Sequence, residues 1–492
     1  MSGGAAAFAE VGVKYDARPL VSPERADAGA SAPWSKWAGS HETEFTVGVE
    51  EEIMLLDPSR GWALSSSIDD VLAAWPASLR DHVSSETHTS AVELRTGVHA
   101  TAAGAVAELA KLRAQLRRVL DGLGLAAAAS GTHPSAVWHE MEVSTRDRHQ
   151  QVYDSMRALA RREPTFALHV HVGLPSGEAG IAAFNRVRAH LPVLLALSAN
   201  SPFWQGRDTG LASARTPLFQ AFPRVGIPRV YGSYSEYVRA VDLLLDCGAF
   251  SDPTYLWWDV RPQPKLGTIE LRIMDAQSSL GATAALVALV QSLVRLELVE
   301  GHADSALVHA SEVLDENRFL AARDGIDAML IDPVRGRAVP ARDVALALMS
   351  SCAPHASALG CTTQLELLGD RLDDPGPPRQ RDLAARYGLE GVLADLAIDF
   401  SEPLDRVELN VACADDRARS DSSIRSPETP LRTQILPRHG PRGDEWRLCV
   451  GSPQKAHAAA HQGVARGRGT VARSRTPFAA PARCPATARS AR

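Results

Sequence analysis

Three consecutive carboxylates, Glu50 to Glu52, interrupt an otherwise apolar run in the stretch Phe45–Leu56. β-Branched residues precede the acids and no helix cap does, so the stretch predicts a β-strand. Alternation places Glu50 and Glu52 on one face and Glu51 on the other. Like charges on a half-buried face repel each other unless cations or donors neutralise them. The pattern fits an edge strand whose acids point into water, or a strand whose acids bind a divalent metal ion.

Three later stretches alternate in the same way, and each carries two ionisable residues on one face. These pairs are Glu93 with Arg95 in Val92–Thr96, His169 with His171 in Thr165–Gly173, and Glu270 with Arg272 in Thr268–Asp275. One such pair is compatible with a solvated edge strand. Four pairs in one chain favour strands that line a shared, inward-facing site.

Helical spacing of leucines predicts a helix over Thr101–Leu120, with Thr101 as its N-cap. A short capped helix is expected at Ser67–Leu72 and an apolar helix at Ala179–Ser198, and Ala282–Met349 is mostly helical with few strand signals. A further strand at Tyr255–Arg261 joins Thr268–Asp275 through a turn that contains Pro and Gly. This order predicts an α+β fold without the regular βαβ alternation of a parallel sheet.

Changes in composition divide the 492 residues into three parts. The composition predicts a mobile leader over residues 1–42, a folded domain over residues 43–409, and a disordered tail rich in Arg, Pro, Ala and Ser over residues 410–492. A basic tail can bind nucleic acid or an acidic surface, but a solvated tail is favoured. Such a composition also arises when the end of a GC-rich coding sequence is read out of frame.

Charge and cysteine usage exclude several classes of protein. The 52 basic and 58 acidic residues give a net charge of −6, so no specific nucleic-acid partner is expected. Six cysteines without a CxxC pair argue against a zinc knuckle, a redox motif or a disulfide scaffold. We find neither a secretory signal nor a stretch long and apolar enough to span a bilayer, which predicts a cytoplasmic protein without membrane contact.

The charged strands predict a particular kind of chemistry. Carboxylates and imidazoles without cysteine form a hard-ligand site suited to Mg²⁺ or Mn²⁺. The interleaved arginines are not needed to hold a cation, but a guanidinium can bind the oxygens of a triphosphate bidentately. A metal ion and a phosphate group in an open sheet together suggest phosphoryl transfer.

A set of motifs in a fixed order resembles the ATP-dependent carboxylate–amine ligases, specifically the type 2 glutamate–cysteine ligases of bacteria. The motifs are Gly48–Glu52, Val92–Thr96, His169–Gly173, Trp258–Pro262 and Ile269–Gln277, followed by Glu316–Gly325 and Pro378–Arg381. The resemblance covers residues 45 to about 404 and leaves out both ends of the chain. Each motif alone is weak, but five or more in the right order are fairly specific.

The resemblance implies a glutamine-synthetase-like fold, in which a curved antiparallel β-sheet backed by helices holds ATP and divalent metal ions. The metal ligands that it implies are Glu50, Glu52, Glu86, Glu93, His169 and Glu270. It places His171 beside the nucleotide, Arg272 against the transferred phosphate, and Arg261 or Lys265 in support. Glu270 and Arg272 are the implied catalytic residues.

The implied reaction has two steps and needs no side-chain nucleophile. ATP phosphorylates a substrate carboxylate, and an amine then attacks the acyl phosphate and expels phosphate. Glutamate and cysteine are the expected amino-acid substrates, and a homodimer is a reasonable expectation.

Two other functions stay open. A nucleotide-binding relative without ligase activity would use nearly the same residues. A metal-dependent amidohydrolase also binds zinc through an HxH strand, but it needs further histidines on later strands, whereas His190, His302 and His309 fall in predicted helices.

Overall fold

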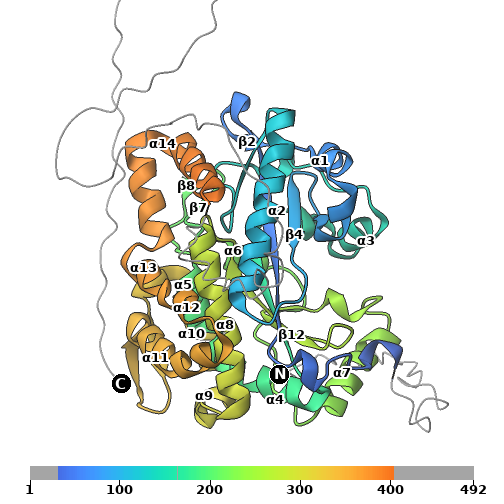
Figure 1. Cartoon of the computed structure of the whole chain (residues 1–492), viewed down its shortest axis with the longest axis vertical. Coiled ribbons are helices and arrows are strands. Elements are labelled where there is room, and N and C mark those ends of the chain that lie inside the picture. The colour runs from blue at the N-terminus through green and yellow to red at the C-terminus, as the bar shows by residue number, and fades with distance from the viewer. Residues whose placement is uncertain (1–31, 163, 404–492) are drawn as a thin grey trace, which may run out of the picture. The chain divides into compact units, whose positions relative to one another are not determined.

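An eight-stranded antiparallel sheet forms the centre of the chain (Figure 1), which the computed structural model describes over residues 32–162 and 164–403. The main path runs β11–β12–β6–β1–β4–β3, and β2 and β5 also pair with β1. The strands are β1 Val47–Asp57, β2 Ala63–Leu64, β3 Val83–Ser85, β4 Ala91–Arg95, β5 Ala126–Ala128, β6 Ala167–Gly173, β11 Val260–Gln263 and β12 Thr268–Asp275. All four predicted charged strands therefore belong to one sheet, and the predicted α+β class is confirmed.

Within residues 32–162 and 164–403, three short strand pairs lie outside this sheet, and helices make up most of what remains. The pairs are β7 Phe203–Trp204 with β8 Arg207–Asp208, β9 Val225–Gly226 with β10 Trp257–Trp258, and β13 Met329–Asp332 with β14 Arg337–Pro340. The α-helices are α1 Ile68–Ala74, α2 Ala102–Leu123, α3 Asp147–Met156, α4 Gly177–Val187, α5 Leu191–Ser198, α6 Arg215–Phe219, α7 Tyr234–Asp246, α8 Leu280–Val299, α9 Ser305–His309, α10 Ser311–Asp324, α11 Ala341–Leu359, α12 Thr362–Glu366, α13 Leu368–Asp373 and α14 Gly376–Ser401.

The main core lies between the sheet and the helices α2 and α8, which run side by side against it (Figure 1). Helix α2 begins as predicted, because the Thr101 side chain accepts a hydrogen bond from the backbone N–H of Gly104. Helix α8 is long and apolar enough to cross a membrane, so the prediction that no segment is so apolar was wrong. Since 83% of its most apolar window is buried inside the fold, α8 serves as a core helix.

The side chains of strand β1 alternate between the two faces of the sheet. Val47, Val49 and Ile53 are buried on the helix side, as alternation predicts. Glu51 lies on that same side and is fully buried, where the guanidinium of Arg113 from α2 binds both carboxylate oxygens. Glu51 is thus turned away from Glu50 and Glu52, but towards a buried partner and not towards water.

Two helical predictions differ from the structure for local reasons. The helix predicted over 179–198 is interrupted by a 3₁₀ turn at Arg188–His190, where Pro192 in the first turn of α5 lacks the N–H that would continue the ladder. The hairpin β13–β14 lies inside the stretch predicted as mostly helical. Its turn contains Pro333 and also Gly336, whose φ of 62° is a left-handed value that suits glycine.

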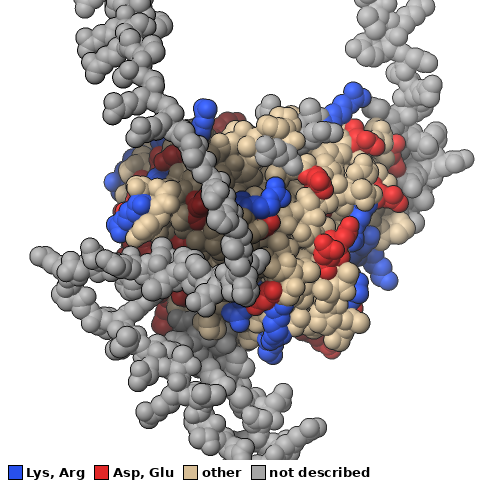
Figure 2. Space-filling model, turned by 90° about the horizontal axis from the view of Figure 1, so that it is seen from above, with Lys and Arg blue, Asp and Glu red and all other residues tan. Residues whose placement is uncertain are grey.

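The N-terminal boundary also differs. Residues 32–42 were predicted to belong to a mobile leader, but Trp34 and Trp37 pack against the main core. The Trp34 indole donates to Asp242 at 2.7 Å, and the Trp37 indole donates to the Leu174 carbonyl at 2.9 Å. The rest of the predicted leader and the predicted tail, residues 410–492, lie outside the described residues. Acidic and basic side chains are interspersed over the described part of the surface in Figure 2.

Candidate active site

A cavity of about 480 Å³ lies on the face of the sheet opposite α2 and α8. Pairing of the strands brings the predicted residues together across this face: Glu50 lies opposite His169, Glu52 opposite Glu93, and Glu270 opposite both His171 and Arg261. The predicted residues that line the cavity are Glu50, Glu52, Glu86, Glu93, His169, His171, Arg261 and Arg272. Glu270 is fully buried beside them.

Lys265 is the exception among the predicted site residues. It is exposed on the turn between β11 and β12, and the cavity wall includes its neighbour Leu266 instead. A lysine ammonium on such a turn keeps its hydration in water, which explains why its nearness in sequence to Arg261 does not place it in the site.

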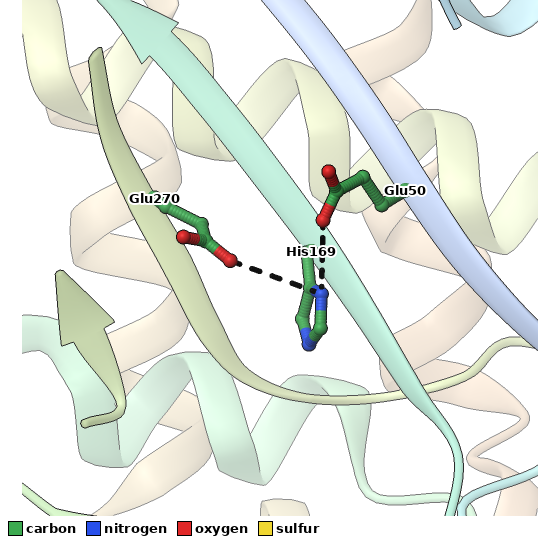
Figure 3. Close-up of side chains that lie close together, drawn as sticks. All are labelled: Glu50, His169 and Glu270. Carbon is green, nitrogen blue, oxygen red and sulfur yellow. Dashed lines mark hydrogen bonds and ion pairs between the residues drawn. The ribbon is translucent and has the colours of Figure 1, made fainter. Parts of the chain in front are cut away.

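Two groups of candidate metal ligands share His169. The first comprises Glu50, His169 and Glu270, and the second comprises Glu52, Glu93 and His169; within each group the ligand atoms lie within 4.8 Å of one another. The His169 Nδ1 atom lies 3.3 Å from Glu50 and 3.9 Å from Glu270, and its Nε2 atom lies 3.9 Å from Glu52 (Figure 3 shows the first group). Oxygen and imidazole donors in this number fit a divalent cation such as Mg²⁺ or Mn²⁺.

Burial and charge shift the pKa values of two carboxyl groups in opposite directions. Burial opposes the ionisation of Glu50, but the charge of His171 and a hydrogen bond to His169 hold its pKa well below the ordinary range. Burial and the charges of Glu50 and Glu52 raise the pKa of Glu93 to about 7. Negative charge is therefore in excess at the Glu93 end, and a cation there would favour the ionised form.

The pKa values of the two histidines are also shifted in opposite directions. Burial and the neighbouring Arg272 lower the pKa of His169, so its imidazole is neutral and has a lone pair for a metal ion. For His171, burial is outweighed by the charges of Glu50 and Glu270, which raise its pKa. The His171 Nε2 atom is 3.6 Å from Glu50 and 3.9 Å from Glu270, and it has no hydrogen-bond partner among the described residues.

Glu270 is the centre of a buried ion network. Arg261 donates to its Oε2 atom at 2.8 and 3.1 Å, Gln263 donates to the same atom at 2.7 Å, and Arg272 donates to Oε1. Although burial opposes ionisation, the charges of Arg261 and Arg272 hold the pKa of Glu270 well below its usual range. The Arg272 Nη1 atom also lies 3.5 Å from the Nδ1 atom of His169, so the Arg272 guanidinium contacts both candidate ligands, Glu270 and His169.

The remaining predicted ligand, Glu86, lies in the segment after β3. It lines the cavity beside Glu93, with which it shares a hydrogen bond. Ser84 donates to Glu93 at 2.9 Å, and the Ala167 backbone N–H donates to Glu52 at 2.7 Å. These contacts orient two acids whose like charges would otherwise separate them.

Sequence reasoning missed several residues of the wall. Arg215 and Phe219 of α6, Trp257 of β10, and Arg148 and Met156 of α3 also line the cavity. Four of them lie on helices, and Trp257 lies in the predicted strand Tyr255–Arg261 but carries no charge, so the pairs of ionisable residues that located the acids give no signal for them. They give the cavity an apolar and cationic part next to its acidic part.

The chain resembles known proteins over most of its described residues. A family model described as glutamate–cysteine ligase family 2 matches residues 46–399. Two relatives from Rubrobacter xylanophilus carry the names "Putative glutamate–cysteine ligase 2-1" and "2-3"; they are 40% and 41% identical over 70% and 72% of this chain and 91% and 96% of their own lengths.

Two solved structures show the same fold. The glutamate–cysteine ligase of Francisella tularensis in complex with AMP has a TM-score of 0.55 and 13% identity, over 74% of this chain and 90% of its own. A bifunctional glutathione synthetase from Pasteurella multocida has a TM-score of 0.53 and 14% identity, over 72% of this chain and 51% of its own. At these identities the likeness concerns the fold, and it confirms the predicted ligase-type sheet.

Proposed function

The chain belongs to glutamate–cysteine ligase family 2, and from this premise we propose that its cavity joins a carboxylate to an amine at the expense of ATP. The observation that carries the proposal is the pair of ligand groups that share His169, together with Arg261 and Arg272, which also line the cavity. Oxygen ligands for a cation and guanidinium groups for an anion are the two requirements of phosphoryl transfer.

Glu50, Glu52, Glu93 and His169 would hold divalent cations, Mg²⁺ or Mn²⁺, with Glu86 and Glu270 completing the set. When bound, such a cation neutralises the phosphate oxygens of ATP. The neutral imidazole of His169 and the ionised carboxylate of Glu50 are already in the protonation states that ligands need. His171, whose Nε2 atom accepts or donates no hydrogen bond within the described part of the chain, lies beside this set and can donate to a phosphate oxygen.

Arg272 has the role of stabilising the phosphoryl group in transfer. Glu270 holds its guanidinium in place, and Arg261 and Gln263 hold Glu270 in turn. A pre-oriented guanidinium in a buried site stabilises developing charge without having to reorganise. The substrate carboxylate attacks the γ-phosphorus of ATP and releases ADP; the amine then attacks the acyl carbon of the acyl phosphate and releases phosphate.

Glutamate and cysteine are the substrates that the family suggests, and we propose glutamate as the carboxylate and cysteine as the amine. The cavity has room for small molecules of this class beside a nucleotide's phosphates. A cytoplasmic location and a homodimer stay predictions, which cell fractionation and light scattering would check.

The test follows the atoms of the first step. Glutamate labelled with ¹⁸O in its carboxylates is incubated with the full chain, ATP, Mg²⁺ and each amine of a panel that includes cysteine. Transfer of ¹⁸O into the released phosphate supports an acyl phosphate, and mass spectrometry identifies the product. ATP binding without phosphate release across the panel would establish the non-catalytic nucleotide-binding alternative.

The amidohydrolase alternative has less support. Each candidate ligand group contains a single histidine. His190 is bound to Glu297 at 2.6 Å and stacks on His302, away from the cavity wall. Tightly bound zinc and hydrolysis without ATP would nevertheless overturn the ligase proposal.

A further inference from the structure

Strand β12 contains a β-bulge at Arg272, the residue proposed to contact the transferred phosphoryl group. Its pairing with β6 passes from Leu271 opposite Val170 to Met274 opposite Leu168, so β12 has one residue more than its partner. The extra residue lies at Arg272–Ile273. A bulge leaves backbone groups outside the ladder and turns the neighbouring side chains in a new direction. The side chain that is turned here belongs to Arg272, the proposed phosphate-binding residue.

The carbonyl groups of this bulge are held by Arg215, the first residue of α6. Its Nη1 atom donates to the Ile273 carbonyl at 3.0 Å, and its Nη2 atom donates to the Arg272 carbonyl at 3.1 Å. Arg215 is 6% exposed; its hydrogen bond to Ile273 is buried, and its hydrogen bond to Arg272 is partly buried. A planar guanidinium can hold two neighbouring carbonyls in this way, whereas a lysine ammonium has no such fork.

Asp275 also holds the Arg215 guanidinium in place. It is fully buried and lies 3.7 Å from the Arg215 guanidinium. The hydroxyl groups of Ser201 and Ser213 donate to Asp275 at 2.7 and 3.0 Å, and the backbone N–H of Asn200 donates at 2.9 Å. The charge of Arg215 is therefore balanced within the fold, and its orientation does not depend on a bound ligand.

We propose, on the basis of the proposed function, that Arg215 is a positioning residue that holds the β12 bulge and thereby aims Arg272 at the transferred phosphoryl group. The backbone of Arg272 is fixed at its other end by a hydrogen bond from its N–H to the Asp259 carbonyl, at 2.8 Å. Loss of the Arg215 side chain frees the Arg272 and Ile273 carbonyls, whereas the Arg272 N–H stays bound to Asp259. Arg272 then keeps its charge and loses its direction.

The chain offers a matched control. Arg188 is 1% exposed and also donates to two backbone carbonyls, those of Pro228 and Val308, but it does not line the cavity. Arg188→Gln therefore removes a buried guanidinium fork of the same kind at a distance from the reaction. A purely structural role predicts equal consequences for Arg188→Gln and Arg215→Gln.

The first readout requires no turnover. Hydrogen exchange of the segment 268–276 in the protein without substrates should be faster in Arg215→Gln than in the wild type and Arg188→Gln. Unchanged exchange in this segment would overturn the proposal. Arg215→Lys, which retains the charge without the fork, should show the same faster exchange and serves if Arg215→Gln does not fold.

The second readout is kinetic. Arg215→Lys should lower kcat about 100-fold with little change in the KM for ATP, because misplacement of a catalytic group by about 1 Å costs that much. The Arg215→Lys, Arg272→Gln double variant should be no slower than Arg272→Gln alone. A further 100-fold loss in the double variant would show that Arg215 does not act through Arg272. If the wild type has no ATP-dependent turnover, the proposed function fails while the exchange measurement still decides the role of the bulge.

Discussion

Glu51→Gln should destabilise the protein strongly without removing a ligand of the site. Glu51 is fully buried, and Arg113, 2% exposed, donates to it through Nε at 2.8 Å and through Nη2. The same guanidinium donates to the carbonyls of Gln277 and Ser278 and lies 4.3 Å from the ring of Phe400. One ion pair thus connects β1, α2, the segment before α8 and α14.

The magnitude follows from what the substitution leaves behind. A glutamine amide presents N–H groups to one side of the guanidinium, and the buried positive charge loses its partner. Removal of one member of a buried ion pair costs about 3–5 kcal/mol. Because folded domains are stable by about 5–15 kcal/mol, this loss is a large fraction of the total.

Urea unfolding followed by tryptophan fluorescence measures the effect. The free energies of unfolding of the wild type and Glu51→Gln are compared with the same m-value for both proteins. The Glu51→Met, Arg113→Met double variant is the control, because replacing both charges by apolar groups leaves no buried charge unpaired. It should recover most of the lost stability. A loss below about 1 kcal/mol in Glu51→Gln, or a fully stable Glu51→Gln that no longer binds ATP, would refute the assignment of Glu51 to the core.

Three further predictions concern the site and the pH dependence. Glu50→Gln should lower the rate of ATP-dependent phosphate release by at least about 100-fold, because one charged ligand is lost. Its free energy of unfolding should stay within about 1 kcal/mol of the wild-type value, because Glu50 lies on a solvent-accessible wall. Equal rates for the variant and the wild type would remove Glu50 from the ligand set. Glu270→Gln should abolish turnover and also destabilise the fold, because Arg261 and Arg272 are left facing each other, and a wild-type urea midpoint would contradict the buried network. Burial lowers the pKa of His133 to about 4, against a backbone hydrogen bond to Trp62 that opposes the shift. As the pH falls below 6.5, His133 is protonated in the unfolded chain before it is protonated in the folded protein. This residue alone should therefore lower the free energy of unfolding by about 2 kcal/mol between pH 7 and pH 5. His133→Gln should make the free energy of unfolding depend less on pH, and an unchanged pH dependence would contradict a buried, neutral His133.

The sequence predicted the acidic face of the site because that face is encoded locally. Strand alternation places the neighbouring residues Glu50 and Glu51 on opposite faces. Regular antiparallel pairing of β1 with β6 then brings His169 next to Glu50. The partner of Glu51 could not be predicted in this way. Arg113 lies 62 residues away, on a helix whose pattern marks it as one more polar residue between leucines.

The other differences have equally local causes. Arg215 owes its position to a five-residue helix and a bulge, neither of which has a periodic signal. The β13–β14 hairpin contained a readable turn signal, with proline and glycine between two short apolar runs, but the helical residues on both sides outweighed it. Trp34 and Trp37 lie in a stretch whose composition resembles a linker, and only their long-range contacts show that it is packed.

The buried pair on one face of β1 and the ligands on its other face make the strand intolerant of slippage. In most strands a one-residue slip exposes apolar side chains. In β1 it would turn Glu50 and Glu52 into the core, where one guanidinium, that of Arg113, faces two carboxylates, and it would leave Glu51 alone in the cavity. A single-residue insertion or deletion between Val47 and Glu50 therefore carries an electrostatic penalty as well as a hydrophobic one. The charge pattern of the strand thus encodes its own alignment with β4 and β6.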